Sequence, residues 1–215
     1  MSRKANGNVL HVEGKDDKYT VIHLMSQHGV SFEPANRVVQ IAEQENDQGV
    51  LEAIEVAVPA GTHGCVGFVL DADVPVEQRW AQVRGRLSPF QIELPPLPPP
   101  EGFVADVPLF KTRVGIWLMP NNVMDYGKIE DLLRTLVPAE DKLIDHAESA
   151  TTTASERGAL FTANDKIKAV LHTWLAWQKT PGCPYGTAVK AAFFGKASEV
   201  ALRFVNWFKL LFRLI

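Results

Sequence analysis

The chain of 215 residues has only two cysteines, Cys65 and Cys183, which lie far apart in the sequence. Two thiols can build neither a disulfide framework nor a four-cysteine zinc site, so we expect free thiols in a reducing, cytoplasmic environment. The chain also lacks a basic excess, because 22 Lys and Arg stand against 25 Asp and Glu, for a net charge of −3. This balance excludes a polybasic binder, and any contact with nucleic acid must come from a local patch.

Long apolar runs are absent as well. Residues 200–215 are rich in Val, Leu, Phe and Trp, but Arg203, Lys209 and Arg213 interrupt them, and they fall short of the ~20 apolar residues of a membrane span. We therefore expect no membrane association, and the residues before Glu13 show no apolar core of a signal peptide. The helix expected over 197–215 either packs on its own domain or uses its apolar surface to form a homodimer.

Hydrophobic residues make up 46% of the chain, which excludes disorder of the whole chain. They alternate between short strand-like runs and helical periodicities, a pattern that predicts an α/β fold with a mostly parallel sheet flanked by helices. We expect residues 1–140 to form this α/β domain, with an extended proline-rich loop at 95–100, and residues 141–215 to form an all-helical C-terminal extension packed on it. The expected strands are 8–14, 38–41, 64–70 and 112–119, and the expected helices of the α/β domain are 16–28, 48–58, 76–87 and 129–136.

Acidic residues follow two of the expected strands. Glu13 belongs to the first strand-to-helix turn, and Asp71 and Asp73 follow an apolar run that ends at Leu70. The carboxyl ends of parallel strands meet at one sheet edge, where open α/β sheets bind ligands. Carboxylates about 4 Å apart repel by roughly 4 kcal/mol per pair at an effective dielectric of about 20, so they need a cation or a proton between them. Oxygen ligands of this kind suit Mg²⁺ or Mn²⁺; the alternative, helix capping, is the interpretation we prefer for Asp16.

The segments around these residues resemble a known family. Val12-Glu13-Gly14-Lys15-Asp16-Asp17, followed by a strand that ends in Asp71-Ala72-Asp73, resembles the Toprim domain of topoisomerases, bacterial primases, OLD-family nucleases and ribosomal-RNA maturases. Residues 115–122, 127–133 and 172–178 are similar to a group of small bacterial Toprim-like proteins related to the nuclease half of OLD proteins. The resemblance spans nearly the whole chain and implies a Toprim-like, Rossmann-like sheet.

The resemblance also implies roles for individual acidic residues. It makes Glu13 a metal ligand or a general acid/base, and Asp71 and Asp73 metal ligands. Asp17 matches the second acidic position of the OLD-type pattern and is a further candidate metal ligand. Glu130 is a candidate ligand of a second metal, and a first-turn helix position favoured by the helix dipole is the equally weighted alternative.

Basic residues provide candidates for contacts with a phosphate. Lys168, with Lys166, resembles the basic residues that OLD-type nucleases place near the phosphate and is a candidate catalytic residue; a solvated helix face is the alternative. His63 is a weaker catalytic candidate near the acidic edge. Further candidates for a phosphate-binding groove are Arg84, Arg86, Lys111 and Arg113.

Two functional hypotheses follow. The first is a Mg²⁺- or Mn²⁺-dependent endonuclease that hydrolyses phosphodiesters of DNA or RNA. The chain has no P-loop, so any ATP dependence needs a partner, and the resemblance suggests an AAA or ABC-type ATPase in anti-phage defence. The family pattern leads us to expect an aspartate where this chain has Asn121, whose amide carries no charge. The alternative is therefore a non-catalytic effector or regulatory subunit that binds an ATPase.

Overall fold

A five-stranded sheet of order β2-β1-β3-β5-β4 forms the centre of the computed structural model, which describes residues 7–60 and 64–215. Four strands are parallel, and β4 pairs with β5 in the antiparallel sense. The mostly parallel α/β sheet expected from the sequence is confirmed, but β4 was not predicted. The strands are β1 (Val9–Val12), β2 (Gln40–Glu43), β3 (Cys65–Leu70), β4 (Phe103–Val107) and β5 (Thr112–Leu118).

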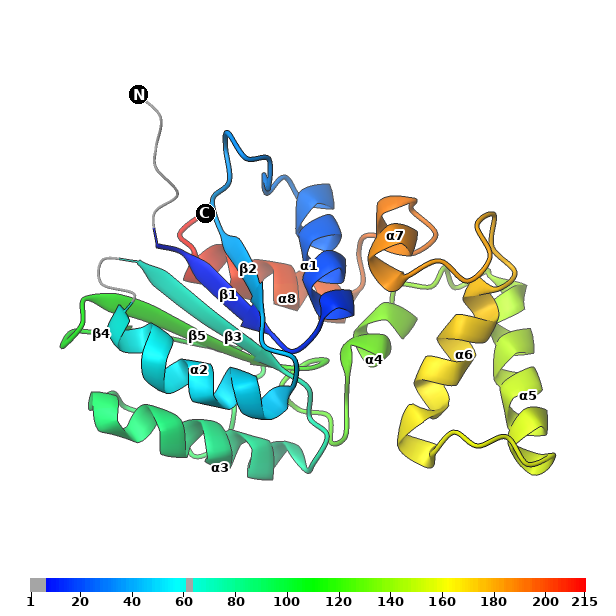
Figure 1. Cartoon of the computed structure of the whole chain (residues 1–215), viewed down its shortest axis with the longest axis horizontal. Coiled ribbons are helices and arrows are strands. Elements are labelled where there is room, and N and C mark those ends of the chain that lie inside the picture. The colour runs from blue at the N-terminus through cyan, green and yellow to red at the C-terminus, as the bar shows by residue number, and fades with distance from the viewer. Residues whose placement is uncertain (1–6, 61–63) are drawn as a thin grey trace.

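Helices cover both faces of the sheet, as Figure 1 shows. One face packs against α1 (Lys15–Gln27) and α8 (Glu199–Leu211), and the other against α2 (Asp47–Ala60) and α3 (Val76–Leu87). All six residues of β3 are buried, which explains why that strand is a continuous apolar run without alternation. The sheet therefore separates two hydrophobic cores, and its four parallel strands end at a common edge.

The C-terminal helix α8 belongs to the layer that covers the sheet. Gly67 of β3 lies opposite Gly115 of β5, and a Cβ at either glycine would lie within 2.7 Å of a methyl group of Leu211. Two adjacent glycines thus make the flat surface on which α8 lies. The indole of Trp207 donates to the carbonyl oxygen of Phe103 at 3.1 Å and fixes the helix further. Because the apolar face of α8 is buried within its own chain, it supplies no argument for a homodimer.

The residues between β5 and α8 form four helices in the part of the chain that the structure describes. They are α4 (Ile129–Arg134), α5 (Lys142–Glu156), α6 (Lys166–Leu175) and α7 (Tyr185–Lys190), with the 3₁₀ turn η2 (Ala163–Asp165) before α6. A further 3₁₀ turn, η1 (Ser88–Phe90), follows α3. Figure 1 shows α5 and α6 side by side, away from the sheet, and α7 next to α1. The expectation that every element after residue 140 is helical is confirmed. Across residues 7–60 and 64–215, no helix has the length and apolar character needed to cross a membrane.

The proline-rich segment 95–100 is an irregular loop, as its composition predicts. Two side chains hold it against the fold. The indole of Trp80 in α3 donates to the carbonyl oxygen of Pro95 at 2.9 Å, and the amide of the buried Asn122 donates to that of Pro100 at 3.3 Å. These two contacts fix the loop that leads into β4.

Candidate metal centre

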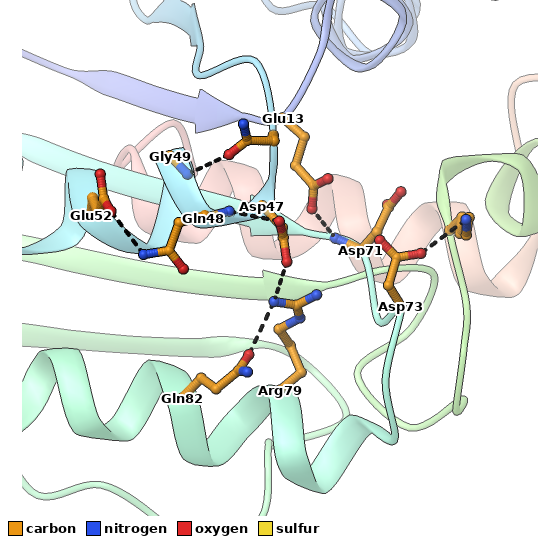
Figure 2. Close-up of polar contacts among 11 residues, drawn as sticks. Glu13, Asp47, Gln48, Gly49, Glu52, Asp71, Asp73, Arg79 and Gln82 are labelled. Atoms are coloured by element: carbon orange, nitrogen blue, oxygen red, sulfur yellow. Dashed lines mark hydrogen bonds and ion pairs between the residues drawn. The ribbon is translucent and has the colours of Figure 1, made fainter.

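Three carboxylates converge where β1 and β3 end. Glu13 directly follows β1, Asp71 and Asp73 follow β3, and the two strands are parallel neighbours. One ligand oxygen from each residue lies within 4.8 Å of the others. The backbone N–H of Asp71 donates to Oε1 of Glu13 at 2.7 Å, which ties the two turns together (Figure 2). We call Glu13, Asp71 and Asp73 the acidic triad. They meet at the carboxyl edge of the sheet, as the parallel strands expected from the sequence predict.

The triad is electrostatically costly without a cation. Burial raises the pKa of Glu13 to about 7, and the nearby charges of Asp17, Asp73 and Asp47 add to this rise. Burial also raises the pKa of Asp71 well above its ordinary value, and the Glu13 carboxylate is the largest charge acting in the same direction. Near neutral pH the metal-free triad therefore retains protons that a bound cation would displace.

The donor set fits Mg²⁺ or Mn²⁺. All three ligands offer carboxylate oxygens, which these hard cations prefer, and within residues 7–60 and 64–215 no thiol or imidazole joins them. In an octahedral site with bonds of about 2.1 Å, adjacent oxygens lie about 3.0 Å apart and opposite ones about 4.2 Å, so the three carboxylate oxygens must draw closer together to hold one ion. Three protein ligands leave positions for water or a phosphate oxygen.

Asp17 and Glu130 lie beside the triad rather than in it. Asp17 accepts a hydrogen bond from the backbone N–H of Gly14 at 2.8 Å, in the first turn of α1, and burial raises its pKa to about 6. Glu130 is buried in the first turn of α4, and burial raises its pKa too. The Glu130 charge also raises the pKa values of Asp17 and Asp71, so the two carboxylates extend the negative field of the triad.

Two lysines lie next to these carboxylates and partly offset their negative charge. The ammonium of Lys128, a residue that the sequence analysis missed, lies 2.9 Å from Oδ1 of Asp73 and 3.9 Å from Oδ1 of Asp165. Although partial burial lowers the pKa of Lys128, its hydrogen bond to Asp73 raises it above the usual value. Lys168, the sequence candidate, is half exposed and lies 4.0 Å from Oε1 of Glu130, on the flank of the triad. Lys128 follows β5, so the same edge rule that found Asp71 could have found it.

A second missed group is Asp47 with Arg79. Figure 2 shows the Asp47 carboxylate between the triad and Arg79. The guanidinium of Arg79 is buried in α3 and donates from Nη1 to Oδ2 of Asp47 at 2.9 Å and to Oε1 of Gln82 at 3.0 Å. Asp47 opens α2 after β2 and so belongs to the same sheet edge. Arg79 holds it in place close to Glu13.

The basic residues proposed for a phosphate groove lie elsewhere. Lys111 and Arg113 are at the amino end of β5, which is about 20 Å from its carboxyl end at ~3.3 Å per residue. Arg84 and Arg86 are in the last turn of α3, at the same remote edge. Arg86 pairs with Glu55 and Arg113 with Asp106. These four candidates for a phosphate-binding groove therefore lie at the opposite end of the strands from the acidic triad.

Asn121, another sequence candidate, takes no part in the triad. Asn121 uses its side-chain oxygen to accept hydrogen bonds from the backbone N–H groups of Val123 at 3.1 Å and Met124 at 2.9 Å. The amide thus shapes the loop after β5, which a carboxylate could do as well. His63 lies outside the described residues.

Comparison with known proteins identifies a family for this chain. A family model described as a protein of unknown function, DUF3226, matches residues 7–213, nearly the whole chain. No curated protein and no solved structure matches the chain. The chemistry must therefore be argued from the acidic triad and its surroundings.

Proposed function

The chain belongs to the DUF3226 family, and we propose that it is a Mg²⁺- or Mn²⁺-dependent endonuclease that hydrolyses phosphodiesters in DNA or RNA. The observation that carries this proposal is the convergence of Glu13, Asp71 and Asp73 at the carboxyl edge of a parallel sheet. Such an edge binds ligands in open α/β folds, and the donor set fits a hard divalent cation. The resemblance to Toprim and OLD-type nucleases points to the same chemistry.

The residues at the site have different roles in this proposal. Glu13, Asp71 and Asp73 would hold the ion, and Asp17 and Glu130 surround it with negative charge. When bound, the ion would supply an activated water and neutralise charge on the phosphate. The resemblance allows a second role for Glu13, in which it is the general acid or base instead of a ligand of the ion.

The two lysines suit a phosphate substrate. The ammonium of Lys128 pairs with Asp73 and that of Lys168 with Glu130, so both lysines lie next to the acidic triad. A phosphate that approaches the triad would meet these ammonium groups instead of unscreened carboxylates alone. Lys168 is the candidate catalytic lysine. The two cysteines are buried free thiols, and we propose a cytoplasmic location in keeping with them.

Asp71→Asn tests the proposal. The substitution removes a ligand charge but keeps the backbone N–H that binds Glu13. We expect Mg²⁺ and Mn²⁺ to raise the melting temperature of the wild type and to raise that of the variant much less. Nicking of plasmid DNA and cleavage of transfer RNA should fall together with the metal response. The matched control is Asp145→Asn, on the exposed surface of α5, which should behave as the wild type.

The outcomes separate the two functional hypotheses. Equal metal responses of Asp71→Asn and the wild type, or undiminished cleavage by the variant, would exclude the role assigned to Asp71. A wild type that binds metal but cleaves neither nucleic acid, even with an AAA or ABC-type ATPase supplied, would favour the non-catalytic regulatory subunit. Cleavage that appears only with the ATPase would identify it as a partner of the nuclease.

A further inference from the structure

A cavity of about 770 Å³ lies next to the acidic triad, between the loop after β5 and the helices α5 and α6. This volume falls within the range of about 300–1,000 Å³ typical of small-ligand pockets. Residues from three separate segments line it, so the tertiary fold builds the cavity. The lining residues that carry the argument below are Met124, Tyr126, Asp131, Glu148, Asn164 and Lys166.

The wall of this cavity is joined directly to the triad. The backbone N–H of Ala72, between Asp71 and Asp73, donates to the carbonyl oxygen of Gly127 at 2.8 Å. The N–H of Val76 donates to Oδ1 of Asp125 at 2.7 Å, which fixes the same loop a second time. Lys128 then bridges the two regions, because its ammonium contacts Asp73 of the triad and Asp165 beside the cavity. A molecule held at the triad therefore has the cavity within reach.

The carboxylates of the cavity are already engaged. Asp125 accepts from the N–H of Val76, and Asp131 accepts from the N–H of Lys128 at 2.8 Å. Glu148 pairs with Arg134 at 2.8 Å. These contacts fix the acidic side chains and partly neutralise them, so the carboxylates do not prevent an uncharged aromatic ring from binding in the cavity.

The groups that remain free suit a nucleobase with its phosphate. Tyr126 is 52% exposed and Met124 45%, so an aromatic ring and a thioether face the solvent at the cavity. Tyr126 also has a φ of 57°, a left-handed conformation that is rare for an aromatic residue and typical of functional loops. Among the described residues, the side chains of Asn164 and Lys166 have no hydrogen bond or ion pair, so an amide and an ammonium are available to a ligand.

We propose that this cavity binds an unpaired base of a single-stranded nucleic acid whose phosphate lies at the acidic triad. The proposal rests on the proposed function and adds a substrate class to it. Tyr126 stacks on the base, Asn164 hydrogen-bonds its edge, and Lys166 contacts a neighbouring phosphate. A base inside a duplex is covered by its neighbours, so only an unpaired base can stack on Tyr126.

Binding of labelled oligonucleotides tests the cavity separately from catalysis. The probes are a fluorescein-labelled 12-nucleotide thymidine strand, its uridine RNA counterpart, a duplex of the same length and a 12-nucleotide abasic strand, all measured by anisotropy with Ca²⁺ in place of Mg²⁺. Stacking on aromatic side chains contributes about 1–3 kcal/mol per base, so Tyr126→Ala should weaken single-strand binding about 5- to 150-fold. Tyr126→Phe keeps the ring and should bind nearly as the wild type does. Leu109→Ala, an exposed apolar residue in the turn between β4 and β5, is the control that should change nothing.

Each result decides the matter. Wild-type preference for single strands over the duplex and the abasic strand, lost in Tyr126→Ala and kept in Tyr126→Phe, supports the proposal, and the better of the DNA and RNA probes identifies the sugar. Equal binding by Tyr126→Ala and the wild type, equal binding of the abasic strand, or no binding of any probe overturns it. The proposed nuclease survives that failure if Mg²⁺ still raises the melting temperature and cleavage of a duplex still depends on Asp71. A wild-type protein whose melting temperature does not respond to Mg²⁺ and that cleaves no nucleic acid would refute the proposed nuclease function as well.

Discussion

Replacement of Glu13 by glutamine should stabilise the metal-free protein. Glutamine keeps the oxygen that accepts from the N–H of Asp71, but it removes one of three converging charges. Burial raises the pKa of Glu13 from 4.5 to about 7. Each unit of such a rise corresponds to about 1.4 kcal/mol, so ionised Glu13 destabilises the folded state by about 3 kcal/mol above pH 7. For a chain of this length, relief of that strain should raise the melting temperature by about 6–12 °C.

The dependence on pH gives this prediction its sign. Between pH 4.5 and about 7, folded Glu13 holds a proton that the unfolded chain has released. The free energy of unfolding of the wild type therefore falls as pH rises through this window, and the Glu13 contribution is constant on either side of it. Glu13→Gln should flatten this part of the profile and should differ least from the wild type near pH 4.5.

Thermal unfolding followed by circular dichroism, in EDTA and at steps from pH 4.5 to 8.5, measures both effects. Glu156→Gln, an exposed change at the end of α5, controls for the loss of one negative charge from the whole protein. Added Mg²⁺ should reverse the order at high pH, because it stabilises the wild type by mass action and the variant less. A Glu13→Gln protein as stable as the wild type at pH 8 in EDTA would show that the triad is not strained, and the reasoning from burial would fail.

Two further predictions concern the fold around the site. Arg79→Ala should lower the free energy of unfolding by about 3 kcal/mol, because it removes a buried ion-paired side chain. Arg86→Ala, at a solvent-exposed ion pair, should lower it far less, and urea unfolding of both variants compares them. Gly115→Ala should destabilise the protein by several kcal/mol, because it forces a Cβ to within 2.6 Å of Leu211. Gly85→Ala, which has open space around it in α3, should stabilise the protein by about 1 kcal/mol. The two melting temperatures should therefore shift in opposite directions, and similar shifts would refute the close approach of α8.

The strands that the sequence predicts well are those whose burial is complete. β3 is buried along its whole length and is a continuous apolar run in the sequence, so its position is evident. In β4 only Phe103 and Val107 are buried, and the three residues between them are not, a pattern with neither alternation nor a continuous run. This strand forms because it pairs with the edge of β5, and the sequence of β4 alone does not show that pairing.

The position of α8 depends on register in the same way. The apolar content of 200–215 predicts that the helix needs a partner, but a homodimer and the protein's own sheet are equal candidates. What decides between them is that Gly67 and Gly115 are opposite each other when β3 pairs with β5. Two glycines 48 positions apart cannot be recognised as one flat surface until the register is known.

At the site, the acidic residues that follow β1 and β3 stand out in the sequence, whereas Asp47 after β2 and Lys128 after β5 do not. Asp47 and Lys128 stand at those two places, and each also stands at the beginning of a helix. A helix start explains an acidic residue without any ligand, so Asp47 carries no distinct signal in the sequence. Arg79 could not have been found, because only the tertiary fold buries it against Asp47.

The charge balance around the triad explains why a divalent cation suits it better than the lysine alone. Ionised Glu13, Asp71 and Asp73 carry three negative charges, and the ammonium of Lys128 on Asp73 offsets one of them. The remaining two negative charges equal the charge of one Mg²⁺ or Mn²⁺ ion. Without that ion the protein retains protons instead, which is what the raised pKa values of Glu13 and Asp71 describe. Metal binding at neutral pH should therefore release protons, and its affinity should rise with pH until both carboxyls are ionised in the metal-free protein.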